Sequence, residues 1–129
     1  MASIDFGMPV LIVDDYKTML RIIGNLLKQL GFQNIEEASD GNQALKKLRD
    51  KRYGLVISDW NMRPMMGMEL LRQVRSDAHL DEVPFVMIAA ENKAENAKAA
   101  RRAGANAYLV KPFNAVTLKT NLTSVIGSF

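Results

Sequence analysis

Residues 10–15 read VLIVDD, and this stretch decides the fold. Four consecutive apolar residues without polar alternation are typical of a strand that is covered on both faces. Two aspartates stop the run, and apolar side chains then recur at helical spacing from Met19 to Leu30, just before Gly31. Glycine commonly ends a helix because it adopts a left-handed backbone conformation without strain. The stretch therefore predicts a buried strand, a polar loop and an amphipathic helix.

The same alternation of strand and helix continues along the chain. Short runs rich in apolar residues predict further strands at residues 33–38, 55–58, 85–88 and 107–110. Apolar positions at helical spacing predict helices that include residues 44–48, 68–74, 92–103 and 116–126. Five strand-then-helix units predict an α/β fold, a doubly wound parallel sheet with helices on both faces.

Length and composition limit the classes of protein that this chain can be. A chain of 129 residues without repeats or linkers fits one domain, so we expect residues 1–129 to form a single domain with residues 1–8 as a loosely ordered lead. No apolar run approaches the ~20 residues that span a membrane. The absence of cysteine excludes disulfides, and the single His79 excludes multi-histidine metal sites. We therefore expect a cytoplasmic protein without a membrane anchor.

The charge of the chain is only mildly basic. Lys and Arg number 17 against 14 Asp and Glu, which gives a net charge of +3. The basic residues are spread along the sequence, and the only adjacent arginines are Arg101 and Arg102. A domain of ~120 residues also leaves no room for a separate DNA-binding domain. We expect no DNA binding.

Charged side chains follow three of the expected strands directly. Asp14 and Asp15 follow the first strand, Asp59 the third, and Lys111 the fifth. In a parallel α/β sheet, ligands bind outside the carboxyl ends of the strands. A lone aspartate at such a place is commonly a turn or N-cap residue. Three carboxylates and one ammonium on three strand ends of one sheet are much harder to explain as turns.

The chemistry of these residue types points to a metal-assisted phosphoryl site. Clustered carboxylates repel one another, and a divalent cation relieves the repulsion. Mg²⁺ prefers hard oxygen ligands and is usually held by one or two carboxylates together with phosphate oxygens. A carboxylate beside such a metal can attack phosphorus to form an aspartyl phosphate. Lys111 adds a positive charge that suits a phosphoryl oxygen.

These residues also carry a family resemblance. The chain resembles response-regulator receiver domains, in particular the single-domain regulators of chemotaxis, and the similarity spans nearly its whole length. That resemblance implies a flavodoxin-like (β/α)5 fold with strand order 2-1-3-4-5. The matching residues, in order, are Val10 to Asp15, Ser58-Asp59-Trp60-Asn61-Met62, Gly67, Ala103-Gly104-Ala105 and Lys111-Pro112-Phe113.

The resemblance implies a role for each site residue. Asp59 would accept the phosphoryl group from a CheA-like histidine kinase. Mg²⁺ would be held directly by Asp15, Asp59 and the backbone carbonyl of Asn61, and through water by Asp14. Lys111 would contact the phosphoryl group and be joined to Pro112 by a cis peptide bond. The protein would then be no enzyme beyond its own phosphorylation and dephosphorylation.

The resemblance also implies an output surface and partners. Tyr108 matches the aromatic residue that changes rotamer on activation. The surface built by residues 92–103, 107–110 and 116–126 would signal to a flagellar motor switch protein or a phosphatase, and the protein would be a monomer. The expected helix at 92–103 carries only small apolar side chains, which is typical of an element that shifts easily.

Two departures from the family pattern stand out. Position 89 holds Ala where the family usually has Ser or Thr, and alanine cannot donate a hydrogen bond to a phosphoryl group. We therefore expect phosphorylation to survive and the switch between Asp59 and Tyr108 to be altered or to depend more on a partner. Arg63 and Pro64 also depart from the common order after the acceptor, which indicates a different local turn.

Three other classes of function, and one other output, compete with this interpretation. A haloacid-dehalogenase-type phosphatase needs a second aspartate where this chain has Asn61, which cannot transfer a proton. A flavin site needs a Ser/Thr/Gly-rich phosphate loop where the chain has Asp-Asp-Tyr. A cyclic dinucleotide or another anion could bind Arg101 and Arg102, although cations at a helix C-terminus equally complement its dipole. Within the receiver interpretation, a phosphate sink for a shared kinase competes with motor output.

Overall fold

The strand predicted from VLIVDD is β1 (Pro9–Val13), and it lies inside a parallel sheet. In the computed structural model, which describes residues 3–129, five strands run in the order β2-β1-β3-β4-β5. All neighbouring strands pair in parallel. The predicted fold class and strand order are confirmed. The other strands are β2 (Asn34–Ala38), β3 (Leu55–Asp59), β4 (Phe85–Ala89) and β5 (Ala107–Val110).

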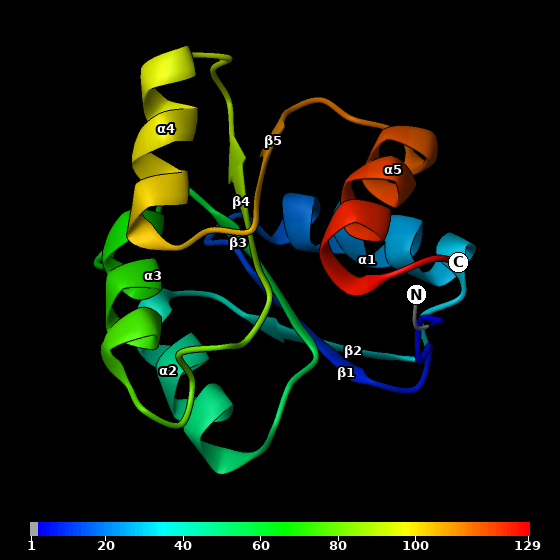
Figure 1. Ribbon diagram of the computed structural model, residues 1–129, viewed down its shortest axis with the longest axis horizontal. Coiled ribbons are helices and arrows are strands. Elements are labelled where there is room, and N and C mark those ends of the chain that lie inside the picture. The colour runs from blue at the N-terminus through cyan, green and yellow to red at the C-terminus, as the bar shows by residue number, and fades with distance from the viewer. Residues whose placement is uncertain (1–2) are drawn as a thin grey trace.

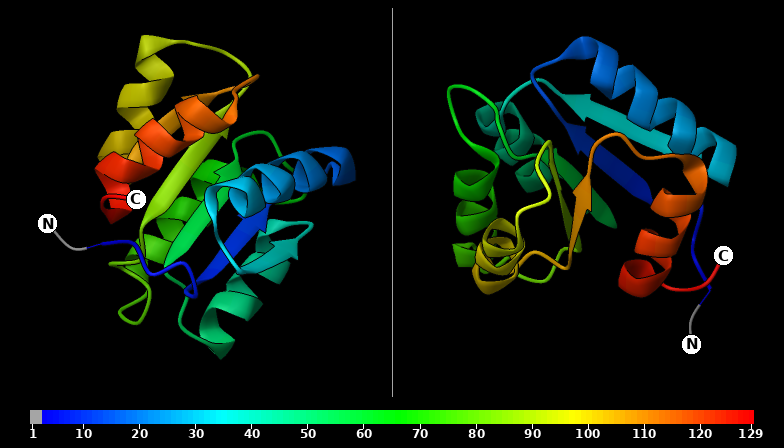
Figure 2. Two further views of the ribbon diagram at one scale, coloured as in Figure 1. Left: turned by 90° about the vertical axis from the view of Figure 1, so that its right-hand side faces the viewer. Right: turned by 90° about the horizontal axis from the view of Figure 1, so that it is seen from above.

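Helices cover both faces of this sheet, as the strand-then-helix pattern predicts. Figure 1 and Figure 2 show α1 and α5 on one face and α2, α3 and α4 on the other. Two separate buried apolar clusters, one under each layer of helices, match this arrangement. The helices are α1 (Lys17–Leu30), α2 (Gly41–Asp50), α3 (Gly67–Ser76), α4 (Ala94–Ala103) and α5 (Ala115–Ile126).

Local sequence signals explain where several helices begin and end. The Asp40 side chain accepts a 2.8 Å hydrogen bond from the Gln43 backbone N–H, so Asp40 caps the start of α2. Gly31 and Gly104 end α1 and α4 with φ values of 113° and 110°, in the left-handed region that glycine adopts freely. The helix expected at 92–103 begins at Ala94, because Lys93 still has an extended backbone.

The central strands are buried, whereas the edge strand β2 is not. Every residue of β3 and β4 is buried, which is why their sequences show apolar runs rather than alternation. In β2 only Ala38 is buried, among the described residues, and Glu36 and Glu37 stand at the sheet edge. An edge strand with acidic side chains resists pairing with another chain.

The two ends of the described chain meet on the side of α1 and α5 (Figure 1). Ser3 forms a parallel bridge with Ser128, and the Ile4 backbone N–H donates to the Ser128 carbonyl at 3.1 Å. Of the expected lead over 1–8, residues 1 and 2 lie outside the described residues. The expectation that the lead is loosely ordered stays a prediction. No helix in the range 3–129 is long and apolar enough to cross a membrane.

Arg75 ties the end of α4 to the neighbouring elements. From α3, its guanidinium donates to the carbonyls of Gly104 and Asp81 and to Asn106 Oδ1, at 2.9, 3.1 and 3.0 Å. The same Asn106 oxygen accepts from the Phe85 backbone N–H at the start of β4. The C-terminal end of α4 is thus held by several hydrogen bonds, while its first two residues, Ala94 and Glu95, are exposed.

The first residue of α3 must be glycine, because the backbone at Gly67 closely approaches the backbone of Asp59 and Trp60. A Cβ atom there would overlap the Asp59 carbonyl oxygen and lie 3.0 Å from Trp60 Cα. We predict that Gly67→Ala lowers the free energy of unfolding by about 1–3 kcal/mol, as overpacking does elsewhere. Urea denaturation measures the change.

Gly24 provides the matched control for this substitution. It lies inside α1, and the nearest atom to an added Cβ is Ile12 Cδ1 at 3.9 Å, an ordinary contact. Gly24→Ala should raise the free energy of unfolding by about 0.5–1 kcal/mol, because alanine favours a helix over glycine. Equal effects of the two substitutions would contradict the close approach at Gly67.

Candidate functional site

The carboxylates predicted at the strand ends lie together at the carboxyl edge of the sheet. Asp59 is the last residue of β3, and Asp14 and Asp15 follow β1 directly. One carboxylate oxygen from each lies within 4.8 Å of the other two. Asp14 and Asp59 are buried, and Asp15 is exposed. The parallel pairing of β1 with β3 brings these residues together, because it sets Val13 beside Ser58.

Lys111 reaches the same cluster from the end of β5. Its Nζ lies 2.9 Å from Asp59 Oδ1 and 3.9 Å from Asp14 Oδ2. The Lys111 backbone N–H donates to the Ala89 carbonyl at 2.9 Å, which fixes its start point against β4. The Lys111–Pro112 peptide is cis, as predicted, and a second cis bond joins Arg63 to Pro64 in the segment between β3 and α3.

One oxygen of this cluster is left without a hydrogen bond. Asp14 Oδ1 accepts from the Tyr16 backbone N–H at 3.0 Å, but the buried Oδ2 has no hydrogen-bond partner among the described residues. Burial raises the pKa of Asp14 to about 6; the Tyr16 N–H opposes this rise, and the negative charge of Asp59 adds to it. A buried carboxylate without enough partners is costly, and a cation would satisfy it.

The donor set fits Mg²⁺ rather than a softer metal. Three carboxylates offer hard oxygen ligands, and the exposed Asp15 leaves one side open to water or to a phosphoryl group. Asn61 is exposed in the loop that leaves β3, two residues after Asp59. The roles assigned to Asn61 and to the aspartates as ligands stay predictions.

The two residues predicted to form the switch lie on β4 and β5. Ala89 ends β4 with its methyl group buried, 5% exposed. The Tyr108 hydroxyl donates to the Glu91 carbonyl at 2.8 Å, and burial raises the pKa of this phenol. Sequence reasoning missed that the Tyr108 ring contacts the ring of Trp60, with centroids 6.1 Å apart at 86°. The signal in the sequence was the sole tryptophan standing next to Asp59.

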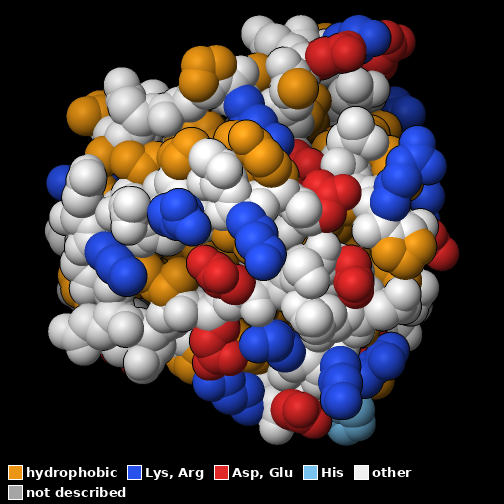
Figure 3. Space-filling view, turned by 180° about the vertical axis from the view of Figure 1, so that it is seen from behind, with side chains coloured by type: hydrophobic (Ala, Val, Ile, Leu, Met, Phe, Trp, Pro, Cys, Tyr) orange, Lys and Arg blue, Asp and Glu red, His pale blue; other side chains and the backbone are white. Residues whose placement is uncertain are grey.

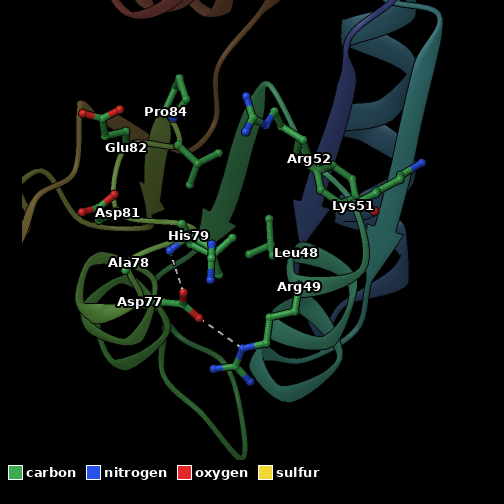
Figure 4. A pocket seen from close by; sticks show the side chains of 13 residues that line it. Leu48, Arg49, Lys51, Arg52, Asp77, Ala78, His79, Asp81, Glu82 and Pro84 are labelled. Carbon is green, nitrogen blue, oxygen red and sulfur yellow. Dashed lines mark hydrogen bonds and ion pairs between the residues drawn. The ribbon is translucent and has the colours of Figure 1, made fainter.

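A cavity lies at the other end of the sheet. It has a volume of about 820 Å³ and is lined by the loops that lead into β3 and β4 (Figure 4). Arg49 and Asp77 join its two walls through a 3.3 Å ion pair. None of the predicted site residues lines it. Ligands of open parallel sheets bind at the carboxyl edge, so this cavity at the amino edge is not the candidate site.

On the face seen from behind (Figure 3), basic residues do not gather in one patch. On the face shown in Figure 3, Lys and Arg side chains alternate with Asp and Glu. Arg101 and Arg102 are exposed in the last turn of α4, where their charges complement the helix dipole. The expectation that the chain does not bind DNA, and the alternative of an anionic ligand at these arginines, stay untested.

Comparison with known proteins agrees with the fold and shows the family of the chain. The family model of the response regulator receiver domain matches residues 10–123. Chemotaxis protein CheY-3 of Vibrio cholerae is 47% identical over 124 residues, which are 96% of this chain and 95% of that protein. Chemotaxis protein CheY of Pseudomonas aeruginosa is 47% identical over 92% of this chain and 95% of its own. The chain belongs to the response regulator receiver family.

Solved structures give the same result. The chemotaxis protein CheY4 of Vibrio cholerae superposes with a TM-score of 0.85 at 34% identity, over 92% of this chain and 98% of that one. The receiver domain of the sensor histidine kinase PA1611 from Pseudomonas aeruginosa has a TM-score of 0.84 at 28% identity, over 95% and 99%. That structure holds a magnesium ion coordinated in its active-site cleft.

The raised pKa of Asp14 makes stability depend on pH. Between the ordinary value of 3.8 and about 6, the folded protein holds a proton on Asp14 that the unfolded chain has lost. Stability from this group is therefore greatest in acid and falls as the pH rises through this window. We predict that Asp14→Asn, which removes the charge, stabilises the metal-free protein more at neutral pH than near pH 4.

Urea denaturation of both proteins in a chelating buffer at the two pH values measures this difference. Asp5→Asn is the control, because Asp5 is exposed and lies before the amino end of β1, whereas Asp14 follows its carboxyl end. An equal effect of Asp14→Asn at both pH values would contradict the raised pKa of Asp14.

Proposed function

We propose that this chain is a phosphoacceptor response regulator of a two-component system. In this proposal Asp59 takes a phosphoryl group from a histidine kinase with the help of Mg²⁺. The observation that carries the proposal is the 2.9 Å contact of Lys111 Nζ with Asp59 Oδ1, beside an Asp14 oxygen that has no hydrogen-bond partner among the described residues. The magnesium ion reported for the receiver domain of PA1611 supports the choice of metal.

The proposed reaction is an in-line transfer. An Asp59 oxygen forms a bond to phosphorus while the bond from phosphorus to the donor's histidine nitrogen breaks. Bound Mg²⁺ would neutralise charge on the transferring group. Asp15, Asp59 and the Asn61 carbonyl would hold the metal, with Asp14 acting through water. Lys111 would follow the negative charge from the carboxylate to the phosphoryl oxygens, because it already lies against Asp59.

Removal of the acceptor should abolish the transfer. We predict that Asp59→Asn accepts no radiolabelled phosphate from a phosphorylated histidine kinase, and that wild type accepts none without Mg²⁺. Asp50→Asn is the matched control, since Asp50 is an exposed residue at the end of α2. Labelling of Asp59→Asn at the wild-type level would show that another residue is the acceptor.

The proposed output surface is the one built by α4, β5 and α5, called the α4-β5-α5 face below. Its proposed target is the flagellar motor switch, because the 47% identical relatives are chemotaxis proteins. In this proposal the chain works as a cytoplasmic monomer that a phosphatase also recognises. It has no enzymatic activity beyond its own phosphorylation and dephosphorylation.

A second output is favoured by one observation, the methyl group of Ala89. A hydroxyl at the end of β4 would bind the phosphoryl group directly, and alanine cannot. A receiver that accepts phosphate but switches weakly would drain a shared kinase, as a phosphate sink does. Binding of the phosphorylated chain to a peptide from a motor switch protein discriminates the two outputs: binding favours the motor, and its absence with normal phosphorylation favours the sink.

Restoring the hydroxyl tests the importance of position 89. We predict that Ala89→Thr leaves the requirement for Asp59 and Mg²⁺ unchanged and enlarges the movement of α4 when beryllofluoride, a phosphoryl mimic, binds. Backbone NMR shifts of residues 94–103 measure that movement, with Ala89→Val as a control of similar shape without a hydroxyl. A wild-type response as complete as that of Ala89→Thr would contradict an altered switch.

A further inference from the structure

The main chain of Trp60 is held on both sides. Its N–H donates to the Ile88 carbonyl of β4 at 2.7 Å, and its carbonyl accepts from the Gly67 N–H of α3 at 2.9 Å. The absence of a Cβ at Gly67 allows this approach, because an added Cβ would lie 3.0 Å from Trp60 Cα. The indole ring is therefore the part of Trp60 that can respond to a change at its neighbour Asp59.

The Trp60 ring is connected to α4 through Tyr108. Its contact with the Tyr108 ring is edge-to-face, with an interplanar angle of 86°. Such pairs have a preferred geometry, so the position of one ring limits that of the other. The Tyr108 hydroxyl in turn donates to the carbonyl of Glu91, in the segment just before α4. The contacts thus run from Trp60 through Tyr108 to the start of α4.

No polar side chain at the end of β4 offers a parallel path. Ala89 is 5% exposed and pairs with Val110 in the register of β4 and β5. Its methyl group can fill space but can neither donate nor accept a hydrogen bond. The beginning of α4 is also the less secured end, because the hydrogen bonds from Arg75 hold the opposite end at Gly104. A change in Tyr108 therefore acts on the end of α4 that can move.

We propose that Trp60 is the positioning residue that holds Tyr108 against the segment before α4, and that this ring contact transmits the state of Asp59 to the α4-β5-α5 face in place of a hydroxyl at position 89. The claim that Trp60 positions Tyr108 rests on the geometry without ligand. The claim that the ring contact transmits the state of Asp59 rests on the proposed function. Both rings are partly buried against the same apolar cluster, so a displaced indole ring would leave Tyr108 without a packing partner on that side.

Fluorine NMR of protein labelled with 3-fluorotyrosine tests both claims. The chain has three tyrosines, so Tyr108 can be assigned by its loss in Tyr108→Phe. Tyr53 is an internal control for folding, because it is buried and its hydroxyl donates a 2.8 Å hydrogen bond to Glu36 Oε1 of β2. Trp60→Leu removes the ring and keeps apolar volume, and Trp60→Phe keeps an aromatic ring.

Without metal or anion, Trp60→Leu should shift the Tyr108 signal toward that of an exposed fluorotyrosine. Trp60→Phe should keep it near the wild-type position, and the Tyr53 signal should stay unchanged in both. A Tyr108 signal that is the same in Trp60→Leu as in wild type would overturn the positioning role. If the Tyr53 signal moves in Trp60→Leu, that variant is misfolded, and Trp60→Phe decides instead. A Tyr108 signal in Trp60→Phe that differs from wild type, with a normal Tyr53 signal, would then overturn the positioning role.

With Mg²⁺ and beryllofluoride, bound fluoride gives signals of its own that report occupancy. Wild type and Trp60→Phe should shift Tyr108 on binding, whereas Trp60→Leu should bind beryllofluoride and lose that shift. Transmission through Trp60 would be overturned if Trp60→Leu binds beryllofluoride and still shows the full Tyr108 shift. It would also be overturned if wild type binds beryllofluoride and shows no Tyr108 shift. Absence of bound beryllofluoride in wild type would instead contradict the proposed function, and transmission with it, and leave the unliganded comparison to decide the positioning role.

Discussion

The crowding of three carboxylates at one edge of the sheet is the constraint on which the rest of this structure depends. Asp14 and Asp59 are buried within reach of each other, and Lys111 offsets only part of their charge. A core built for stability alone would not keep such a group, because burial penalises each charge. The buried Asp14 oxygen, which accepts no hydrogen bond from any described residue, is the local sign of this cost. A divalent cation would relieve this crowding.

The fold supplies the rigidity that this crowding requires. β3 and β4 are buried along their full length, so the end of each strand is fixed by packing on both faces of the sheet. Asp59 stands on such an end, and the Gly67 approach secures the backbone that follows it. The output side is built differently. The start of α4 is exposed, and its far end is held by Arg75. The carboxylate site is therefore held more firmly than the start of α4 on the proposed output surface.

Much of this could be predicted from the sequence, and the failures have physical causes. Apolar runs ending in charge predict both the buried strands and the edge where Asp14, Asp59 and Lys111 meet, because parallel strands end on the same side. The sequence pattern predicts a helix from residue 92, two residues before α4 begins, because the small apolar residues of this segment give a weak pattern. The contact of Trp60 with Tyr108 joins the end of β3 to β5 across the intervening β4, which periodicity along the chain does not encode.

The fluorescence of Trp60, the only tryptophan in the chain, provides the most direct test of the central claim, because this residue directly follows Asp59. We expect the emission to change when Mg²⁺ is added and to change again when acetyl phosphate, a small phosphoryl donor, follows. Asp59→Asn should lose the second change. A wild-type protein whose emission responds to neither addition would contradict the assignment of this edge as a metal-dependent phosphoacceptor site.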